Sequence, residues 1–462
     1  MAAPLGFVGA LLIAAKVARG VSRKRKQDEI MEEYRKGLAV PLEQALQVRD
    51  GMITQMEIGL RETGSKQGLL MLPSYIDILP TGAERGDFFA IDLGGTNLRV
   101  AYVKLGSEKG STESSSIREW LIPEECYDTD NGRLLDWVAE RTIEFAQEHG
   151  RLKRDSPPPT IGFCFSFAVD QTAMDNGKLL LWTKIPVILN DTVSTLIARR
   201  YSEPDTALGI ILGTGTNCAY LERIDRIPKP PSDYRGRSSE MIINSEWGDF
   251  KGACLPALPE DLWVDCSSVN PGHGGFEKMI SGLYMGEVSR RLVLRLAEHG
   301  LLFGSEVPPG LTVHDPLASP LVAAIVGDGS PNLALTASSL ASAFGITKSS
   351  LDQRRKVKEV CLLVTRRGAR LCAAGIAAVL KHTGRGCGGA DQPAKRTVIA
   401  VDGSVFKKFA KFRELLRAAL EEFCGADAAQ VELKLQEDGS VFGGAYIAAA
   451  ASSWTSRASS GS

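Results

Sequence analysis

The sequence predicts an α/β protein built from two related lobes. Along its 462 residues, apolar strands alternate with amphipathic helices, and some strands are joined in hairpins by tight glycine turns. The segments 88–99 (FFAIDLGGTNLR) and 207–223 (ALGIILGTGTNCAYLER) share one form: an apolar strand, a turn of glycine and threonine, and a second strand. We interpret this as a loose internal repeat, which is typical of two related lobes.

Hydrophobic periodicity and turn residues place the other elements. Helices are expected at 27–64 with a break near Pro41, and at 134–149, 192–201, 277–300, 349–382 and 411–423. Strands are expected as a hairpin at 87–105 and at 161–169, 178–184, 187–191 and 396–406, with a final strand, turn and alanine-rich helix from residue 431. Polar loops are expected at 69–86 and 107–116.

Composition excludes several classes of protein. A formal net charge of −1 argues against a general nucleic-acid binder, and 44% apolar residues suffice for ordinary cores. The nine cysteines show neither a CxxC pair nor a zinc spacing, so we expect reduced intracellular thiols. A monomer of two or three domains is the default expectation.

The N-terminal segment differs from the rest of the chain. It is apolar as far as Lys16, and the basic run VSRKRK follows at 21–26, whereas a secretory signal carries its charge before the apolar run. We interpret residues 1–22 as an anchor that holds a cytosolic protein on a membrane. A cleaved transit peptide and a short amphipathic helix remain open.

Three strands end in small polar turns of the kind that bind phosphate. The turns are DLGGTN, LGTGTN and VDGS, in which glycine lets backbone N–H groups approach an anion and threonine adds a hydroxyl donor. Neither a GxxxxGK[ST] motif nor the HRD and DFG motifs occur, so the P-loop and protein-kinase interpretations fail. The pattern indicates a phosphate held between lobes.

A second set of polar residues suits a ligand rich in hydroxyl groups, because carboxylates accept from hydroxyls and amides both donate and accept. Taken singly, each is better explained as a cap or a surface charge. The set comprises Ser166, Thr183, Lys184, Asn190, Asp191, Asn217, Glu246 and Glu277.

Together these motifs resemble the ordered signature set of the eukaryotic hexokinases, most closely the membrane-anchored hexokinases of plants and green algae. The resemblance covers residues 35–452, which we divide into an N-terminal region 35–206 and a C-terminal region 207–452. It is carried by FFAIDLGGTNLRV, GFCFSFAVDQT, LWTK, LNDTV, IILGTGTNCAYLE, INSEWGDF, NPGHGGFEKMISGLYMGE and VDGSVF.

The resemblance implies a two-lobed actin-like ATPase (ribonuclease H-like) fold with a sugar cleft between the lobes. It also implies transfer of the γ-phosphate of ATP to the 6-hydroxyl of glucose or a related hexose, the first step of glycolysis, with Mg²⁺ carried by the nucleotide. The implied location is the cytosolic face of the mitochondrial outer membrane, with plastid or cytosol as alternatives.

Site residues follow from the resemblance position by position. Asp191 matches the catalytic base and Lys184 the lysine that reaches toward sugar and phosphate. The sugar contacts are Ser166, Thr183, Asn190, Asn217, Glu246 and Glu277. The nucleotide contacts are Asp92, Gly94, Gly95, Thr96, Asn97 and Arg99 in the first turn, Gly213, Thr214 and Gly215 in the second, and Asp402, Gly403 and Ser404 near the adenosine.

The chain departs from the family pattern between Lys184 and Val187. The family has roughly thirty residues there, and a parallel crossover needs a dozen or more, yet only Ile185 and Pro186 intervene. We therefore expect impaired activity, a catalytically weak glucose-binding sensor, or a shortened gene model of an active enzyme. Further departures are Gly274 in place of a glutamine, Ala168 in place of a proline, and Phe442, which is expected to crowd the adenine.

Overall fold

The structure is a computed structural model of the chain. It describes residues 5–76, 78–94, 96–126, 133–150, 160–165, 169–173, 176–179, 190–229, 238–314, 317–387 and 394–460. Two compact units are present, each assembled from separate stretches. One contains residues 1–48, 251–374 and 408–423, and is called the helical unit here; the other contains 49–250, 375–407 and 424–462, and is called the sheet unit. The division at residue 206 concerns regions of the sequence and stays a prediction.

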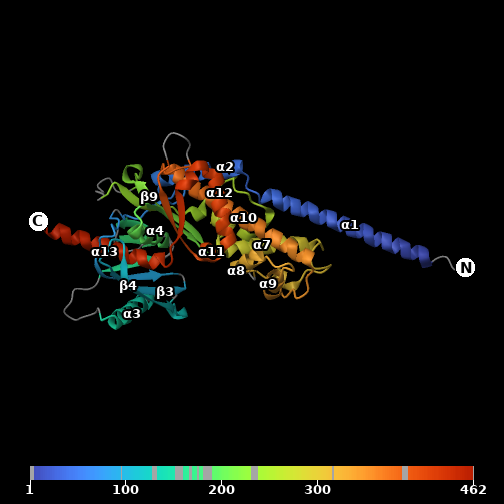
Figure 1. Cartoon of the computed structure of the whole chain (residues 1–462), viewed down its shortest axis with the longest axis horizontal. Helices are drawn as coiled ribbons and strands as arrows, with labels where there is room; N and C mark the ends of the chain where they lie inside the picture. Colours follow the sequence, from blue (N-terminus) through green and yellow to red (C-terminus); the bar gives the residue numbers. More distant parts are fainter. Residues whose placement is uncertain are drawn as a thin grey trace. The chain divides into compact units, whose positions relative to one another are not determined.

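The sheet unit contains both large β-sheets, drawn with their helices in Figure 1. The six-stranded sheet has the order β1-β10-β9-β8-β11-β12, and the four-stranded sheet has the order β4-β3-β2-β5. Their strands are β1 (Leu72–Pro73), β2 (Gly86–Leu93), β3 (Asn97–Leu105), β4 (Thr112–Leu121), β5 (Ile161–Phe165), β8 (Thr206–Leu212), β9 (Thr216–Arg223), β10 (Glu240–Asn244), β11 (Thr397–Asp402) and β12 (Val431–Leu435). A separate pair is formed by β6 (Val169–Ala173) and β7 (Asn176–Leu179).

The internal repeat predicted from the sequence is confirmed in the two sheets. In each, a hairpin is formed by antiparallel strands, β2 with β3 and β8 with β9. In each, the first hairpin strand also pairs in parallel with a later strand, β2 with β5 and β8 with β11. The two glycine–threonine turns therefore occupy equivalent places in two sheets of related topology.

Thirteen α-helices are described across the two units. They are α1 (Leu5–Gly37), α2 (Leu42–Arg61), α3 (Arg133–Glu148), α4 (Asp191–Ser202), α5 (Pro259–Ser267), α6 (Gly275–Ile280), α7 (Gly282–Glu298), α8 (Ser319–Gly327), α9 (Ala334–Phe344), α10 (Leu351–His382), α11 (Ser404–Lys408), α12 (Ala410–Cys424) and α13 (Gly439–Ser460). In the part of the chain that the structure describes, no helix combines the length and apolar character needed to span a membrane.

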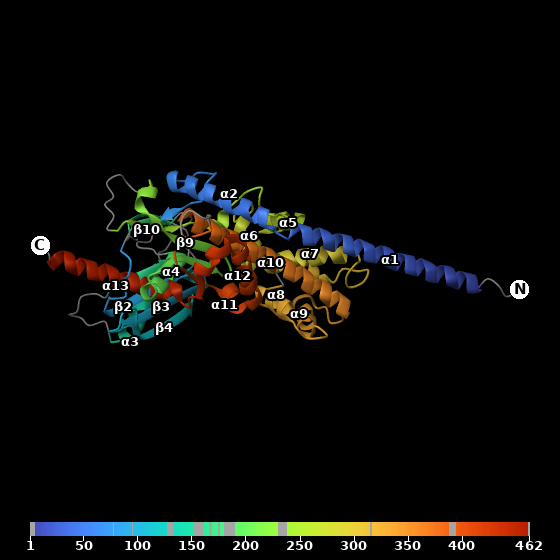
Figure 2. The same ribbon diagram turned by 45° about the horizontal axis from the view of Figure 1, so that its top comes forward.

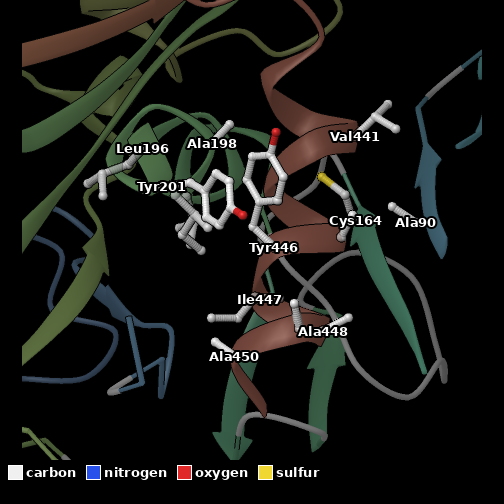
Figure 3. Close-up of a cluster of buried hydrophobic side chains, with 14 of the residues drawn as sticks. Ala90, Cys164, Leu196, Ala198, Tyr201, Val441, Tyr446, Ile447, Ala448 and Ala450 are labelled. Atoms are coloured by element: carbon white, nitrogen blue, oxygen red, sulfur yellow. The ribbon is translucent and has the colours of Figure 1, made fainter. Parts of the chain in front are cut away.

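Two helices, α4 and α13, lie side by side between the sheets of the sheet unit (Figures 1 and 2). Helix α4 packs on β8 and β9 of the six-stranded sheet, whereas α13 packs on β2, β3 and β5 of the four-stranded sheet. One hydrophobic cluster runs through both helices, and Figure 3 shows the rings of Tyr201 and Tyr446 stacked inside it, with centroids 4.1 Å apart. The layers therefore share a single core.

Glycine permits the close approach of these layers. A Cβ atom on Gly443 of α13 would lie 2.0 Å from the backbone oxygen of Ser194 in α4. On the outer sides, a Cβ on Gly209 of β8 would lie 2.5 Å from the Thr192 oxygen, and one on Gly162 of β5 would lie 1.9 Å from the Gly444 oxygen. A larger residue at any of these three positions would force the neighbouring elements apart, because the atoms in the way belong to the main chain.

The helical unit is held partly by buried ion pairs. Arg367 of α10 is fully buried and donates to both carboxylate oxygens of Asp261 in α5, at 2.6 and 2.7 Å. Arg290 and Glu287 of α7 form a second buried pair. A buried bidentate pair orients the helices that carry it, and removing one partner would leave an uncompensated charge.

Predicted boundaries are wrong in three places. The strand expected at 396–406 ends at Asp402, and α11 begins at Ser404. The polar segment 107–116 is not all loop, because β4 begins at Thr112 and pairs antiparallel with β3. Most of its side chains face solvent on an edge strand, so no apolar alternation marked it. The helix expected at 277–300 is two helices, α6 and α7, separated by Ser281 in an extended conformation with ψ of 159°.

The expectation of nine reduced thiols is also wrong for two of them. Cys387 and Cys424 form a disulfide across 37 residues of sequence. The intervening stretch contains β11 and α12, so only the tertiary fold brings the two thiols together. The cysteines described as free are Cys126, Cys164, Cys218, Cys254, Cys266, Cys361 and Cys372.

We expect Gly443→Ala to destabilise the protein, because the added methyl would collide with the backbone of α4. Overpacking of this kind costs about 1–3 kcal/mol, which urea denaturation followed by tryptophan fluorescence would detect as a lower midpoint. The matched control is Gly327→Ala in α8, where a Cβ meets nothing within 4 Å. Equal midpoints for the two variants would contradict the close-packing argument.

Candidate functional site

Asp191 is the first residue of α4, which begins one residue before the predicted helix start, whereas residues 187–189 of the predicted strand lie outside the described residues. Asn190 is the N-cap, and its side-chain oxygen accepts from the Thr192 N–H at 2.9 Å. The Asp191 carboxylate accepts from the same N–H at 2.8 Å and from the Thr192 hydroxyl at 3.2 Å. A carboxylate in the first helical turn is stabilised by the helix dipole.

The pKa of Asp191 is nevertheless raised to about 6. The main cause is burial, since the carboxyl is largely removed from water although the residue keeps some exposed surface. The negative charge of Asp92 raises this pKa further, and the two hydrogen bonds from Thr192 oppose both effects. A carboxyl with this pKa is largely ionised at neutral pH and sufficiently basic to take a proton from a hydroxyl group.

A cavity of about 240 Å³ opens beside Asp191 within the sheet unit. It is lined by residues from five separate parts of the sequence, including predicted members of the first and third phosphate turns. Its lining is Arg99, Asp191, Ile211, Asp402, Gly403, Lys407, Glu437, Asp438 and Ser440. Ile211, Lys407, Glu437, Asp438 and Ser440 were not predicted from the sequence as site residues.

The first turn contributes a buried ion pair beside this cavity. Arg99 donates through Nη2 to Asp92, whose side chain is only 4% exposed. Burial alone would lower the pKa of Arg99, but the Asp92 carboxylate raises it above the ordinary value. The other oxygen of Asp92, Oδ1, is buried and has no hydrogen-bond partner among the described residues. The N–H of Gly94 donates to the carbonyl oxygen of Asn97 at 2.9 Å.

Two other predicted members of the first turn, Thr96 and Asn97, do not line the cavity. The side chain of Asn97 donates to Glu119 on β4, and Thr96 is exposed. Gly95 lies outside the described residues. The structure therefore brings Arg99 to the cavity, with Asp92 buried behind it, and the Asn97 amide donates to β4 instead.

The second and third turns lie against each other because β8 and β11 are neighbouring parallel strands. A Cβ on Gly213 would lie 3.5 Å from the Gly403 Cα, and Gly403 itself has φ of +110°, which favours glycine. Thr214 and Ser404 are exposed at these strand ends, beside Gly215. Ligands of open α/β sheets bind at such carboxyl ends.

Asp402 ties the third turn to the start of α13. Its two oxygens accept from the backbone N–H groups of Gly403, at 2.6 Å, and Gly439, at 3.1 Å. Burial raises the pKa of Asp402, and these two hydrogen bonds counteract the rise. The carboxylate thus links two glycine turns.

Predicted sugar contacts form a second polar cluster in the same unit. The amide nitrogen of Asn217 donates to Asn244 at 2.8 Å and to Glu246 at 3.1 Å, and Asn244 donates to Glu246 at 2.7 Å. Glu246 has φ of +54°, a left-handed conformation that is uncommon for residues other than glycine. Asn244 was not predicted, although it lies two residues before Glu246 on the same strand end.

The remaining predicted residues are distributed as follows. Glu277 lies on α6 of the helical unit, near Gly274, whose φ of +66° suits the glycine found there. Ser166, Thr183 and Lys184 lie outside the described residues, as do Ala168 and the shortened segment between Lys184 and Val187. Expectations that rest on them stay predictions.

Phe442 does not face the cavity. It is partly buried against the hydrophobic cluster of the sheet unit and stacks on Tyr446, with ring centroids 6.2 Å apart. This orientation gives no support to the expectation that Phe442 crowds the adenine.

No group of three or more acidic, histidine or cysteine side chains is arranged to hold a metal ion among the residues described.

The chain matches known hexokinases along nearly its whole length. Family models described as hexokinase match residues 30–185 and 207–450. Hexokinase-2 of Oryza sativa subsp. japonica is 36% identical over 97% of this chain and 96% of its own length. Hexokinase-1 of Spinacia oleracea is 38% identical over 92% of this chain and 91% of its own length.

Solved structures agree with this result. A hexokinase from Schistosoma mansoni complexed with glucose is similar with a TM-score of 0.79 and 29% identity, over 91% of this chain and 99% of that one. Another hexokinase crystal structure has a TM-score of 0.75 and 25% identity, over 92% and 99% of the two chains. The fold is therefore the two-lobed, actin-like α/β fold of sugar kinases, and the chain belongs to the hexokinase family of ATP-dependent hexose phosphotransferases.

Proposed function

We propose that this protein transfers the γ-phosphate of ATP to the 6-hydroxyl of glucose or a related hexose, with Asp191 as the general base. The observation that carries the proposal is the position of Asp191, at a helix start on a cavity that also contains Arg99 and two glycine turns. Asp191 would accept the hydroxyl proton as the sugar oxygen attacks the γ-phosphorus.

The glycine turns and Arg99 are assigned to binding the phosphates of ATP. Phosphoryl transfer depends on positioning and on stabilising charge on the phosphate oxygens. Helices α4 and α13 both begin at this cavity, so the positive ends of their dipoles favour an anion there. Arg99 adds a full positive charge.

Mg²⁺ is proposed to enter with ATP and to neutralise charge on its phosphates. Mg²⁺ prefers oxygen donors and usually keeps several waters. The buried Oδ1 atom of Asp92, which has no partner among the described residues, is an oxygen of this kind in the first turn. This supports a place for the hydrated ion near the first turn.

We expect Asp191→Asn to abolish most turnover, since the amide keeps the shape of the side chain but cannot accept the proton. General-base catalysis typically contributes about 10²–10⁴-fold, so kcat in a coupled glucose 6-phosphate assay should fall by about that factor. Asp225→Asn is the matched control, because Asp225 is an exposed carboxylate of the same unit paired with Arg223. Full activity of Asp191→Asn would show that another group is the base.

The wild-type assay also separates the alternatives raised by the segment between Lys184 and Val187. Turnover well above background supports an active hexokinase. Glucose binding by calorimetry without turnover would instead support the weak sensor, and the proposal of catalysis would be wrong.

The activity should depend on pH with an acid limb near pH 6. Asp191 acts as a base only when ionised, and its pKa is raised from 3.8 to about 6. As the pH falls through 6, the carboxylate takes up a proton, so log kcat/KM should decrease with a slope of one. Rates measured from pH 4.5 to 8.5 at constant ionic strength would test this, and a profile that stays flat to pH 4.5 would contradict it.

We also propose that residues 1–22 attach the protein to a membrane, on the cytosolic face of the mitochondrial outer membrane or of the plastid. The apolar run before Lys16 and the exposed basic residues Lys24 and Lys26 support partial insertion beside anionic lipid. Deleting residues 2–20 should move the protein from the membrane fraction to the soluble fraction of cells. Recovery of the intact chain in the soluble fraction would refute the attachment.

A further inference from the structure

The pentapeptide DGSVF occurs twice in the chain, at 402–406 and at 438–442. Each copy follows a strand of the six-stranded sheet and leads into a helix: β11 into α11, and β12 into α13. The first copy supplies Asp402 and Gly403 to the cavity, and the second supplies Asp438 and Ser440. The site is therefore formed by two copies of one turn sequence at neighbouring strand ends.

Three consecutive residues of the second copy contact the side chains of Arg99, Asp402 and Asp92. The Asp438 carboxylate accepts from Arg99 Nη1 at 3.2 Å. The Ser440 hydroxyl accepts from Arg99 Nη2 at 2.7 Å and donates to Asp92 at 2.8 Å, while the Gly439 N–H donates to Asp402. The second copy therefore contacts both terminal nitrogens of Arg99, and Asp92 of β2 contacts Nη2 as well.

The backbone at Asp438 is unusual. Its φ is +52°, in the left-handed region where aspartate and asparagine are enriched among residues other than glycine. Its carbonyl oxygen accepts from the N–H groups of Val441 and Phe442, at 3.1 and 3.0 Å, which begins α13. This conformation aims the side chain at Arg99 while the main chain starts the helix.

The ion pair between Asp438 and Arg99 is poorly placed to stabilise the fold. The Asp438 side chain is 46% exposed, and exposed ion pairs contribute little to stability because water and salt screen them. The Arg99 pair with Asp92, by contrast, is buried. The contact between Asp438 and Arg99 is therefore better explained by a role in orienting the guanidinium than by a contribution to the stability of the fold.

We propose that Asp438 is a positioning residue, which holds the guanidinium of Arg99 in the orientation that receives the phosphates of ATP. Without Asp438, the guanidinium would be held only at Nη2, by Asp92 and Ser440. The contact of Asp438 with Nη1 fixes its second end. This inference rests on the proposed placement of phosphate beside Arg99. The neighbouring Glu437 pairs with Lys407 instead, so Asp438 is the member of this acidic pair that contacts Arg99.

The test is Asp438→Asn, which keeps the size and the left-handed backbone preference but removes the charge. Small misplacement of a positioned group is costly, so we expect the KM for ATP to rise about 10-fold. The KM for glucose and the thermal unfolding midpoint should stay at wild-type values. Glu432→Gln is the matched control, since Glu432 on β12 is 41% exposed and pairs with Arg396, away from the cavity lining.

A double-mutant cycle separates positioning from a general effect. In an Arg99→Met background, Asp438→Asn should add no further change in the KM for ATP, because the group that it orients is gone. An equal loss in both backgrounds, or a loss no larger than that of Glu432→Gln, would overturn the proposal.

Calorimetry with a non-hydrolysable ATP analogue and Mg²⁺ gives a readout that does not need turnover. Weaker binding by Asp438→Asn than by wild type, by about the same factor, supports the positioning role even if turnover is absent. Equal affinities would refute it. If the wild-type protein binds the ATP analogue but shows no turnover, the proposed catalysis is wrong, whereas the positioning role is still decided by the comparison of affinities.

Discussion

The packing of α4 against α13 is the constraint on which the site depends. Gly443 lets the two helices approach until their backbones touch, and Gly209 and Gly162 let each helix approach its own sheet. Because both helices begin at the same cavity, this contact places Asp191 beside the turn at 438–440. A shift of either helix would move the proposed base relative to the groups that receive phosphate, and catalysis tolerates little misplacement.

The same arrangement explains the charge balance of the site. Carboxylates from β2, α4 and β11 lie close enough for Asp92 and Asp402 to raise the pKa of Asp191. Arg99 offsets part of this charge, and the start of α13 holds Arg99 through a carboxylate and a hydroxyl. The pKa near 6 therefore results from burial and neighbouring charge, both set by how the layers pack.

Local signals were sufficient for much of the fold. The hairpins at the two glycine–threonine turns, the helix break near Pro41 and the long helix α10 follow from residue patterns, because turn chemistry and amphipathic periodicity act over a few residues. The edge strand β4 was not predicted, because its exposed side chains show no apolar alternation. The disulfide between Cys387 and Cys424 was not predicted, because the spacing of two cysteines along the chain does not give their distance in space.

By itself, the sequence determined the family, the α/β class and the candidate residues of the turns, since these depend on motifs that are local and ordered. The tertiary structure decided which of them meet. It brought Arg99, Asp191 and Asp402 to one cavity and turned Asn97 toward β4 and Phe442 toward the core. It also added Asp438 and Ser440, which the repeated DGSVF could have signalled. The physical reason is that side-chain direction and burial follow from packing between elements distant in sequence.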